Sequence, residues 1–161
     1  MLASATTRQS GWTNANVNAD LKTVPAANRT NMAHYIDGFV LPIPRDRLDE
    51  YQRLVEAVAE IWKEHGALDY REFVGDDLAF AGTRSFTDLV AATEDEAILF
   101  GWVTFASRES RDAANEKVAS DPRVAKLMES SNTGFDAERM AYGGFRSFAS
   151  TARTSPNTSS S

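Results

Sequence analysis

Residues 97–105 read AILFGWVTF, and this stretch decides the fold class of the chain. Aromatic and β-branched residues dominate it, and an acidic run at 94–96 stands directly before it, a pattern that predicts a β-strand. Large apolar residues occupy both parities of the strand: Leu99, Val103 and Phe105 on one side, Ile98, Phe100 and Trp102 on the other. We therefore expect a strand that is covered on both faces.

Before this strand, the sequence predicts a strand, a helix and a second strand. Residues 34–41, HYIDGFVL, form the first strand, which ends at a pair of prolines because proline cannot donate to a sheet ladder. Residues 46–65 have apolar positions three and four residues apart, which indicates an amphipathic helix with Asp46 as its N-cap. Residues 68–75 alternate as the second strand, and residues 76–95 form a long connection without a sustained period.

Beyond residue 105, the sequence predicts two helices and a last strand. Ser107 is placed to cap the first helix, and Asp121 is placed to cap a shorter one that begins with a proline. Residues 139–148 predict the last strand, in which the pair Gly143 and Gly144 suggests a bulge or a close approach of backbone. The main elements therefore follow the order β-α-β-β-α-β.

This order predicts an α+β, ferredoxin-like βαββαβ fold. Such a fold has a four-stranded antiparallel sheet, in the strand order 4-1-3-2, with two main helices on one face. The helices can cover one face only, although the first and third strands are apolar on both. We expect the second face to pack against a second copy of the chain, which makes the protein a homodimer.

The composition is typical of one globular domain, with 161 residues of which 42% are hydrophobic and 25% charged. The apolar periodicity is confined to residues 32–150, so we expect the domain there and disordered segments at 1–31 and 151–161. Residues 32–150 contain 13 basic and 22 acidic side chains, a net charge of −9. An acidic surface repels phosphate backbones, so nucleic acid is not an expected partner.

Several kinds of segment and site are missing from the sequence. No run of about 18 apolar residues predicts a membrane span, and no continuous apolar stretch indicates a secretory signal, so we expect a cytoplasmic protein without a membrane partner. The chain has no Cys, and its two His residues lie 31 positions apart, a spacing that matches no standard metal site. Glycine-rich phosphate loops are also missing. We therefore expect no metal and no cofactor.

Two residues are candidates for catalysis. His65 can act as a general base because imidazole titrates near neutral pH, although at a helix end it also complements the helix dipole, which is the simpler interpretation. Asp37 lies in the middle of a strand that we expect to be covered on both faces. It either forms a buried ion pair with Arg139 or Arg146 of the neighbouring last strand, or lines a pocket as a functional carboxylate.

Substrate-binding candidates are the residues that would line a pocket between the sheet and the helices, with the connection 76–95 as its roof: Arg71, Trp62, Trp102 and Tyr142. Aromatic side chains with polar tips, among which we also count Tyr70, are typical of small-molecule sites, although such residues more often belong to the core. Arg71 and Glu72 point to opposite faces of the second strand, so only one of them can face the pocket. We take Arg71 as that residue.

Five segments carry a resemblance to known proteins: residues 34–44 (HYIDGFVLPIP), 62–70 (WKEHGALDY), 74–77 (VGDD), 107–123 and 135–145. In order and spacing they resemble a bacterial family catalogued as domain of unknown function 1428, over about residues 32–148. The resemblance implies a dimeric α/β-barrel fold and no established activity. Cofactor-independent monooxygenases, small isomerases and ligand-binding stress proteins of the same superfamily are analogies of fold alone.

Two function hypotheses remain open. In the first, the protein binds or converts a small apolar or aromatic molecule without a cofactor, and His65, Asp37 and Arg71 are the polar groups of its pocket. In the second, the protein is a non-catalytic dimer that acts in stress or as an interaction module, and the same residues serve packing and pairing.

Overall fold

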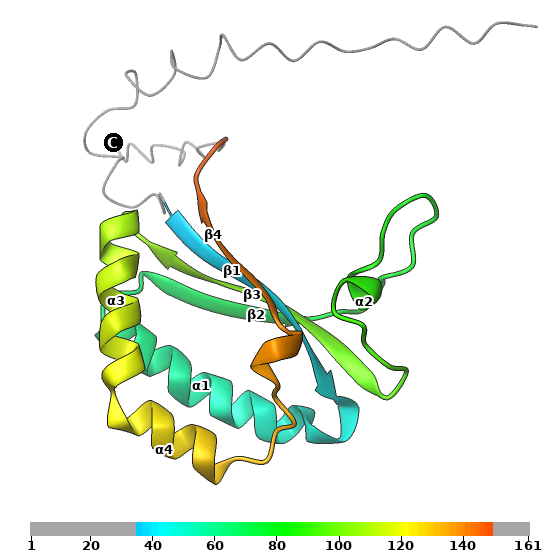
Figure 1. Ribbon diagram of the computed structural model, residues 1–161, viewed down its shortest axis with the longest axis horizontal. Helices are drawn as coiled ribbons and strands as arrows, with labels where there is room; N and C mark the ends of the chain where they lie inside the picture. The colour runs from blue at the N-terminus through cyan, green and yellow to red at the C-terminus, as the bar shows by residue number, and fades with distance from the viewer. Residues whose placement is uncertain (1–34, 150–161) are drawn as a thin grey trace, which may run out of the picture. The chain divides into compact units, whose positions relative to one another are not determined.

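The computed structural model describes residues 35–149 of the chain. The two ends that we expect to be disordered, residues 1–31 and 151–161, therefore lie outside the described residues. Within the described part, the strands and helices form the α+β arrangement that the sequence predicts (Figure 1).

One antiparallel sheet of four strands forms the centre of the fold. The strands are β1 (Tyr35–Pro44), β2 (Asp69–Val74), β3 (Glu96–Phe105) and β4 (Ala141–Arg146). Their order in the sheet is β2-β3-β1-β4, which confirms the predicted order of a ferredoxin-like fold. β1 pairs along its whole length with β3, from Tyr35 opposite Phe105 to Pro44 opposite Glu96.

Three helices lie on one side of this sheet (Figure 1). They are α1 (Leu48–Glu64), α3 (Arg108–Ser120) and α4 (Pro122–Ser130). A short 3-10 turn, η4 (Arg45–Arg47), leads from β1 into α1, and another, η5 (Ala137–Arg139), leads into β4. The short helix α2 (Phe86–Leu89) lies on the other side of the sheet.

The caps of α3 and α4 are confirmed, and the cap predicted for α1 is wrong. The Ser107 hydroxyl accepts a hydrogen bond from the backbone N–H of Ser110, and the Asp121 carboxylate accepts one from the N–H of Arg123. Asp46 caps nothing, because it lies within η4, and α1 begins after Arg47 without a side-chain cap. The 3-10 turn η4 leads directly into α1, so a turn rather than a capping side chain precedes the helix.

The main core lies between the sheet and the helices, and the strand alternation decides which residues enter it. Odd-numbered residues of β1 and β3 point toward the helices, as the pattern of residues 97–105 predicts. The buried members of this core are Phe39, Leu41, Ile43, Tyr51, Ala67, Ala97, Leu99, Val103, Phe105 and Ala114. Even-numbered residues of β1 and β3 point to the opposite face.

The connection between β2 and β3 covers part of this opposite face, so the prediction that it roofs a pocket under the helices is wrong. Val90 packs with Val40 and Ile98 in a small second core. The ring of Phe86 lies 5.8 Å from that of Phe100. The connection takes this position because its apolar side chains match the apolar residues that the helices leave uncovered.

The rest of the opposite face carries exposed aromatic side chains. Phe73, Phe100 and Phe145 are each between 42% and 57% exposed, and Trp102 is half-buried. The Phe73 and Trp102 rings stack at 5.4 Å, and those of Phe100 and Trp102 meet edge to face at 5.8 Å. We call these four residues the aromatic face.

Candidate functional site

A cavity of about 230 Å³ lies between the helix-facing side of the sheet and helices α1 and α4. Apolar and aromatic side chains make up nearly all of its wall. The lining residues are Phe39, Leu41, Tyr51, Leu54, Val55, Val58, Trp62, Tyr70, Glu72, Val103, Met128, Phe135, Met140 and Tyr142. Its roof comes from α4 and from the segment between α4 and β4, which supply Met128, Phe135 and Met140.

Among the residues that the structure describes, Glu72 is the one carboxylate that lines this cavity, and two tyrosines donate hydrogen bonds to it. The Tyr51 hydroxyl donates a hydrogen bond to Glu72 Oε2 at 3.0 Å, and the Tyr70 hydroxyl donates one to Oε1 at 2.6 Å. Burial raises the pKa of Glu72, although both hydrogen bonds oppose the shift. Burial, followed by the charge of Glu72, also raises the pKa of Tyr51 and Tyr70 well above its usual value, so both remain protonated donors.

The backbone of β3 makes room for this arrangement at Gly101. This glycine lies opposite Glu72 in the sheet. A Cβ atom on Gly101 would approach Glu72 Cγ and Phe39 Cζ to 2.7 Å and the Arg71 carbonyl oxygen to 2.6 Å. Any other residue at this position would therefore displace two of the side chains that line the cavity.

A second polar cluster lies behind Tyr142, at the β4 side of the cavity. The Tyr142 hydroxyl donates to Oδ2 of Asp37, which is 1% exposed, and Asn115 of α3 lies 3.4 Å from the same oxygen. Burial, followed by the bond to Asp37, raises the pKa of Tyr142 above its usual value. Asp37 thus lies behind a lining residue and fixes its position.

Arg111 of α3 is the charge partner of Asp37. Its Nε lies 3.2 Å from Asp37 Oδ1, an ion-pair distance, although the two atoms do not meet in hydrogen-bond geometry. Arg111 also donates to the Tyr35 hydroxyl at 2.9 Å, and its guanidinium carbon lies 5.0 Å from the centre of the Tyr35 ring. The bond to Tyr35, more than the charge of Asp37, raises the pKa of Arg111.

The prediction that Asp37 pairs with Arg139 or Arg146 is therefore wrong. Arg139 lies in η5, before β4 begins, and forms an ion pair with Glu96 at the start of β3. Arg146 lies opposite Tyr35 rather than opposite Asp37. The residue opposite Asp37 is Gly144, which has no side chain, so the guanidinium of Arg111 reaches the carboxylate from the helix layer.

The other sequence candidates separate into those at the cavity and those away from it. Trp62 and Tyr142 line it. Trp102 and Arg71 point to the opposite face of the sheet, where Arg71 is exposed and pairs with Asp69. Because Arg71 and Glu72 point to opposite sides of β2, the residue that faces the cavity is Glu72, and the choice of Arg71 is wrong.

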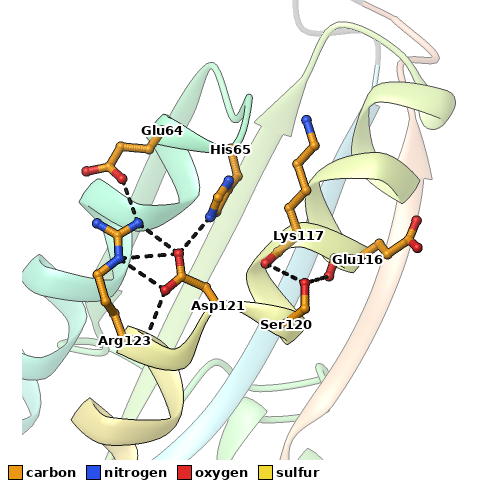
Figure 2. Close-up of polar contacts among 7 residues, drawn as sticks. All are labelled: Glu64, His65, Glu116, Lys117, Ser120, Asp121 and Arg123. Atoms are coloured by element: carbon orange, nitrogen blue, oxygen red, sulfur yellow. Dashed lines mark hydrogen bonds and ion pairs between the residues drawn. The ribbon is translucent and has the colours of Figure 1, made fainter.

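His65 lies at the end of α1, in an ion-pair network that joins α1 to α4 (Figure 2). Its Nε2 lies 2.8 Å from Oδ2 of Asp121, the N-cap of α4. Arg123 contacts the same carboxylate and also pairs with Glu64 at 2.7 Å. The Arg123 guanidinium, and next the His65 ring, hold the pKa of Asp121 well below its usual value. None of these four residues lines the cavity.

The polar residues of the two clusters that sequence reasoning missed include Tyr51, Glu72, Arg111 and Asn115. The signal for Arg111 is helical spacing, because it shares one face of α3 with the buried residues Ala114 and Val118. The signal for Glu72 is strand alternation, because it has the parity of Tyr70. No sequence pattern joins Tyr51, on α1, to Glu72, 21 residues later.

Residues 35–149 contain no group of three His, Cys, Asp or Glu side chains that could hold a metal ion. In the same part of the chain, no helix combines the length and the apolar character that crossing a membrane requires.

The chain matches a family model described as protein of unknown function (DUF1428) over residues 34–137. It belongs to this family. It is 42% identical over 113 residues to the uncharacterized protein YbaA of Escherichia coli strain K12, which covers 70% of this chain and 95% of that protein. The uncharacterized protein YbaA of Shigella flexneri matches with the same identity and coverage.

Two solved structures are similar to this chain at low sequence identity. The first is a monooxygenase from the gene ActVA-Orf6 of Streptomyces coelicolor in complex with nanaomycin D, with 13% identity, a TM-score of 0.46, and coverage of 76% of this chain and 94% of that one. The second is SnoaB, a cofactor-independent oxygenase from Streptomyces nogalater, with 11% identity, a TM-score of 0.37, and coverage of 78% and 99%.

Proposed function

We propose that this protein binds a small, largely apolar molecule, about the size of two fused aromatic rings, in the cavity between the sheet and the helices, without a cofactor. The observation that carries the proposal is the composition of the cavity wall, which is apolar or aromatic, with polar atoms on three tyrosines, on the indole of Trp62 and on one carboxylate. Small-molecule sites commonly combine an apolar wall with a few fixed polar groups.

The size of the cavity supports a ligand of one or two rings. An apolar cavity of about 150 Å³ accommodates benzene, and this cavity has about 230 Å³. Aromatic side chains on several sides, among them Phe39, Trp62 and Phe135, favour a flat ring through stacked and edge-to-face contacts. An aromatic ligand therefore fits the wall better than a branched aliphatic one.

A binding measurement with naphthalene tests the proposal. In equilibrium dialysis we expect saturable binding of one naphthalene per chain. Val58→Phe adds a ring to the cavity wall and should weaken binding at least tenfold. Ala125→Phe places the same ring on the exposed side of α4 and should leave binding unchanged. Equal binding by both variants, or no saturable binding by the unaltered protein, would show that the cavity is not a ligand site.

A second candidate function is association through the aromatic face. We propose that two copies of the chain pack this face together as a homodimer, because an exposed aromatic patch on one copy matches the same patch on another. In that case the protein acts as a non-catalytic interaction module, and the cavity stays empty. Light scattering tests the association, and the dialysis experiment tests the cavity separately.

A further inference from the structure

We propose that the ligand of the cavity is a hydroxyaromatic compound whose hydroxyl group donates a hydrogen bond to Glu72. This inference rests on the proposed function and adds the chemical class of the ligand. This ligand class follows from the direction of the hydrogen bonds that residues of the cavity wall make with one another.

The hydroxyl protons of all three lining tyrosines are already in use. Tyr51 and Tyr70 donate to Glu72, and Tyr142 donates to Asp37. A phenol has one proton to donate, so these three side chains offer a ligand only the lone pairs of their oxygens. The tyrosines and the carboxylate therefore offer a ligand hydrogen-bond acceptors, and the group that complements an acceptor is a donor.

Glu72 retains free acceptor capacity toward such a donor. A carboxylate has about four lone-pair positions, and the tyrosines fill one on each oxygen of Glu72. The two hydrogen bonds also fix the orientation of the carboxylate before a ligand arrives, which reduces the cost of ordering it on binding. Gly101 lets the Glu72 side chain lie directly against the backbone of β3, because a Cβ there would displace it. The carboxylate is therefore a pre-positioned acceptor.

The negative charge near the cavity disfavours acids, and the apolar wall disfavours cationic donors, so a neutral hydroxyl fits best. Within residues 35–149, no Lys, Arg or His lines the cavity, so none of these residues would neutralise a ligand carboxylate. A second hollow, which shares Tyr51, Tyr70 and Glu72 with the cavity, is lined by the acidic residues Asp49 and Glu56, which adds to the repulsion of anions. A cationic amine would have to lose its hydration in an apolar space, whereas a phenol loses much less.

Burial destabilises the charged form of Glu72, and a ligand hydroxyl offsets this effect. The raised pKa of Glu72 reflects the loss of water around the carboxylate, which the two tyrosines restore only in part. A third hydrogen bond, from the ligand, would stabilise the same charge. A hydrogen bond to a charged group contributes about 1.5 to 3 kcal/mol, which corresponds to about tenfold or more in affinity.

Three probes of equal ring size test the inference on the unaltered protein: naphthalene, 2-methoxynaphthalene and 2-naphthol. Only 2-naphthol has a hydroxyl to donate. In equilibrium dialysis at neutral pH, we expect 2-naphthol to bind about tenfold or more tightly than either of the others. Saturable binding of naphthalene without this preference overturns the hydroxyaromatic ligand and leaves the proposed function standing. Failure of all three probes to bind overturns both.

Glu72→Gln tests the acceptor itself. The amide has nearly the same shape but no charge, so we expect the preference for 2-naphthol to fall below about threefold while naphthalene binds as before. Glu129→Gln, on the exposed side of α4, removes the same charge away from the cavity and should keep the full preference. A full preference in Glu72→Gln would overturn the role of Glu72. If this variant does not fold, the three probes on the unaltered protein still decide the question.

Discussion

At the scale of single residues, Asp37 is the most deeply buried charged side chain that the sequence singles out. Its position in the middle of a strand was enough to predict burial and the need for a partner. The identity of the partner was not predictable, because Arg111 is 74 residues away and reaches it from another layer of the fold. The strand order predicts which residues of the adjacent strands lie near Asp37. A contact from a helix packed on the sheet depends in addition on how that helix is rotated about its axis.

Asp37→Asn should destabilise the protein by about 3 to 5 kcal/mol. The substitution removes the charge that faces Arg111 and leaves a cation in a site that is largely closed to water. Asp112→Asn removes the other carboxylate near Arg111, which is exposed, and should cost less than about 1 kcal/mol. Urea denaturation of the two variants gives both values, and similar small losses would contradict a buried ion pair.

Gly144→Ala should destabilise the protein by about 1 to 3 kcal/mol, whereas Gly143→Ala should not. A Cβ on Gly144 would lie 2.6 Å from Nη2 of Arg111 and would also collide with the Tyr35 hydroxyl. A Cβ on Gly143 would meet only the Phe145 ring, at 3.5 Å, which is ordinary contact. The sequence indicated a close approach at this pair without saying which glycine it required. Equal stability of the two variants in thermal unfolding would contradict the account.

At the scale of elements, the order of strands and helices was predictable because apolar periodicity and caps are local signals. Ser107 and Asp121 cap helices as predicted, since a cap acts within three residues of itself. The path of the connection between β2 and β3 was not predictable. It depends on which face of the sheet has uncovered apolar residues, and that is a property of the whole fold. The cavity roof, built from Met128, Phe135 and Met140, was missed for the same reason.

Asp121→Asn should lower the melting temperature at neutral pH because it removes the negative charge through which the start of α4 contacts His65 at the end of α1. Asparagine keeps the N-cap hydrogen bond, so the loss reports the contacts with His65 and Arg123. The folded state lowers the pKa of Asp121 below its ordinary value of 3.8, so its charge stabilises the fold above about pH 4. The stabilisation is lost as the pH falls below that value, where the unfolded chain takes up the proton first.

The difference in melting temperature between Asp121→Asn and the unaltered protein should therefore be largest above about pH 4 and shrink toward pH 2. Asp136→Asn provides the control, because Asp136 caps η5 through a backbone N–H and is exposed. Its melting temperature should differ little from that of the unaltered protein over the same range. A difference at Asp121 that stays constant with pH would mean that its charge has no part in joining the two helices.

At the scale of the whole molecule, the two faces of the sheet are covered in different ways. One face carries the core and the cavity, and the other carries the connection between β2 and β3 and the aromatic face. The sequence predicted that both faces are apolar, which residues 97–105 already show. Alternation alone says that Glu72 and Arg71 diverge, and the parity that Glu72 shares with Tyr70 identifies it as the inward residue only once Tyr70 is known to face the helices.

If two copies associate through the aromatic face, light scattering should give twice the monomer mass at micromolar concentration. Phe100→Asp should then give a folded monomer, because the charge falls on the contact surface and the side chain is 42% exposed in a single chain. Leu68→Asp, at an exposed site before β2, should remain a dimer. A monomer mass for the unaltered protein would contradict the homodimer proposal.

A crystal structure of the protein soaked with 2-naphthol shows whether the cavity under α1 and α4 receives a hydroxyaromatic ligand. We expect electron density for the two rings between Phe39, Trp62 and Phe135, with the naphthol oxygen within hydrogen-bond distance of a Glu72 carboxylate oxygen. An empty cavity at a saturating concentration, or naphthol bound only on the aromatic face, would contradict it.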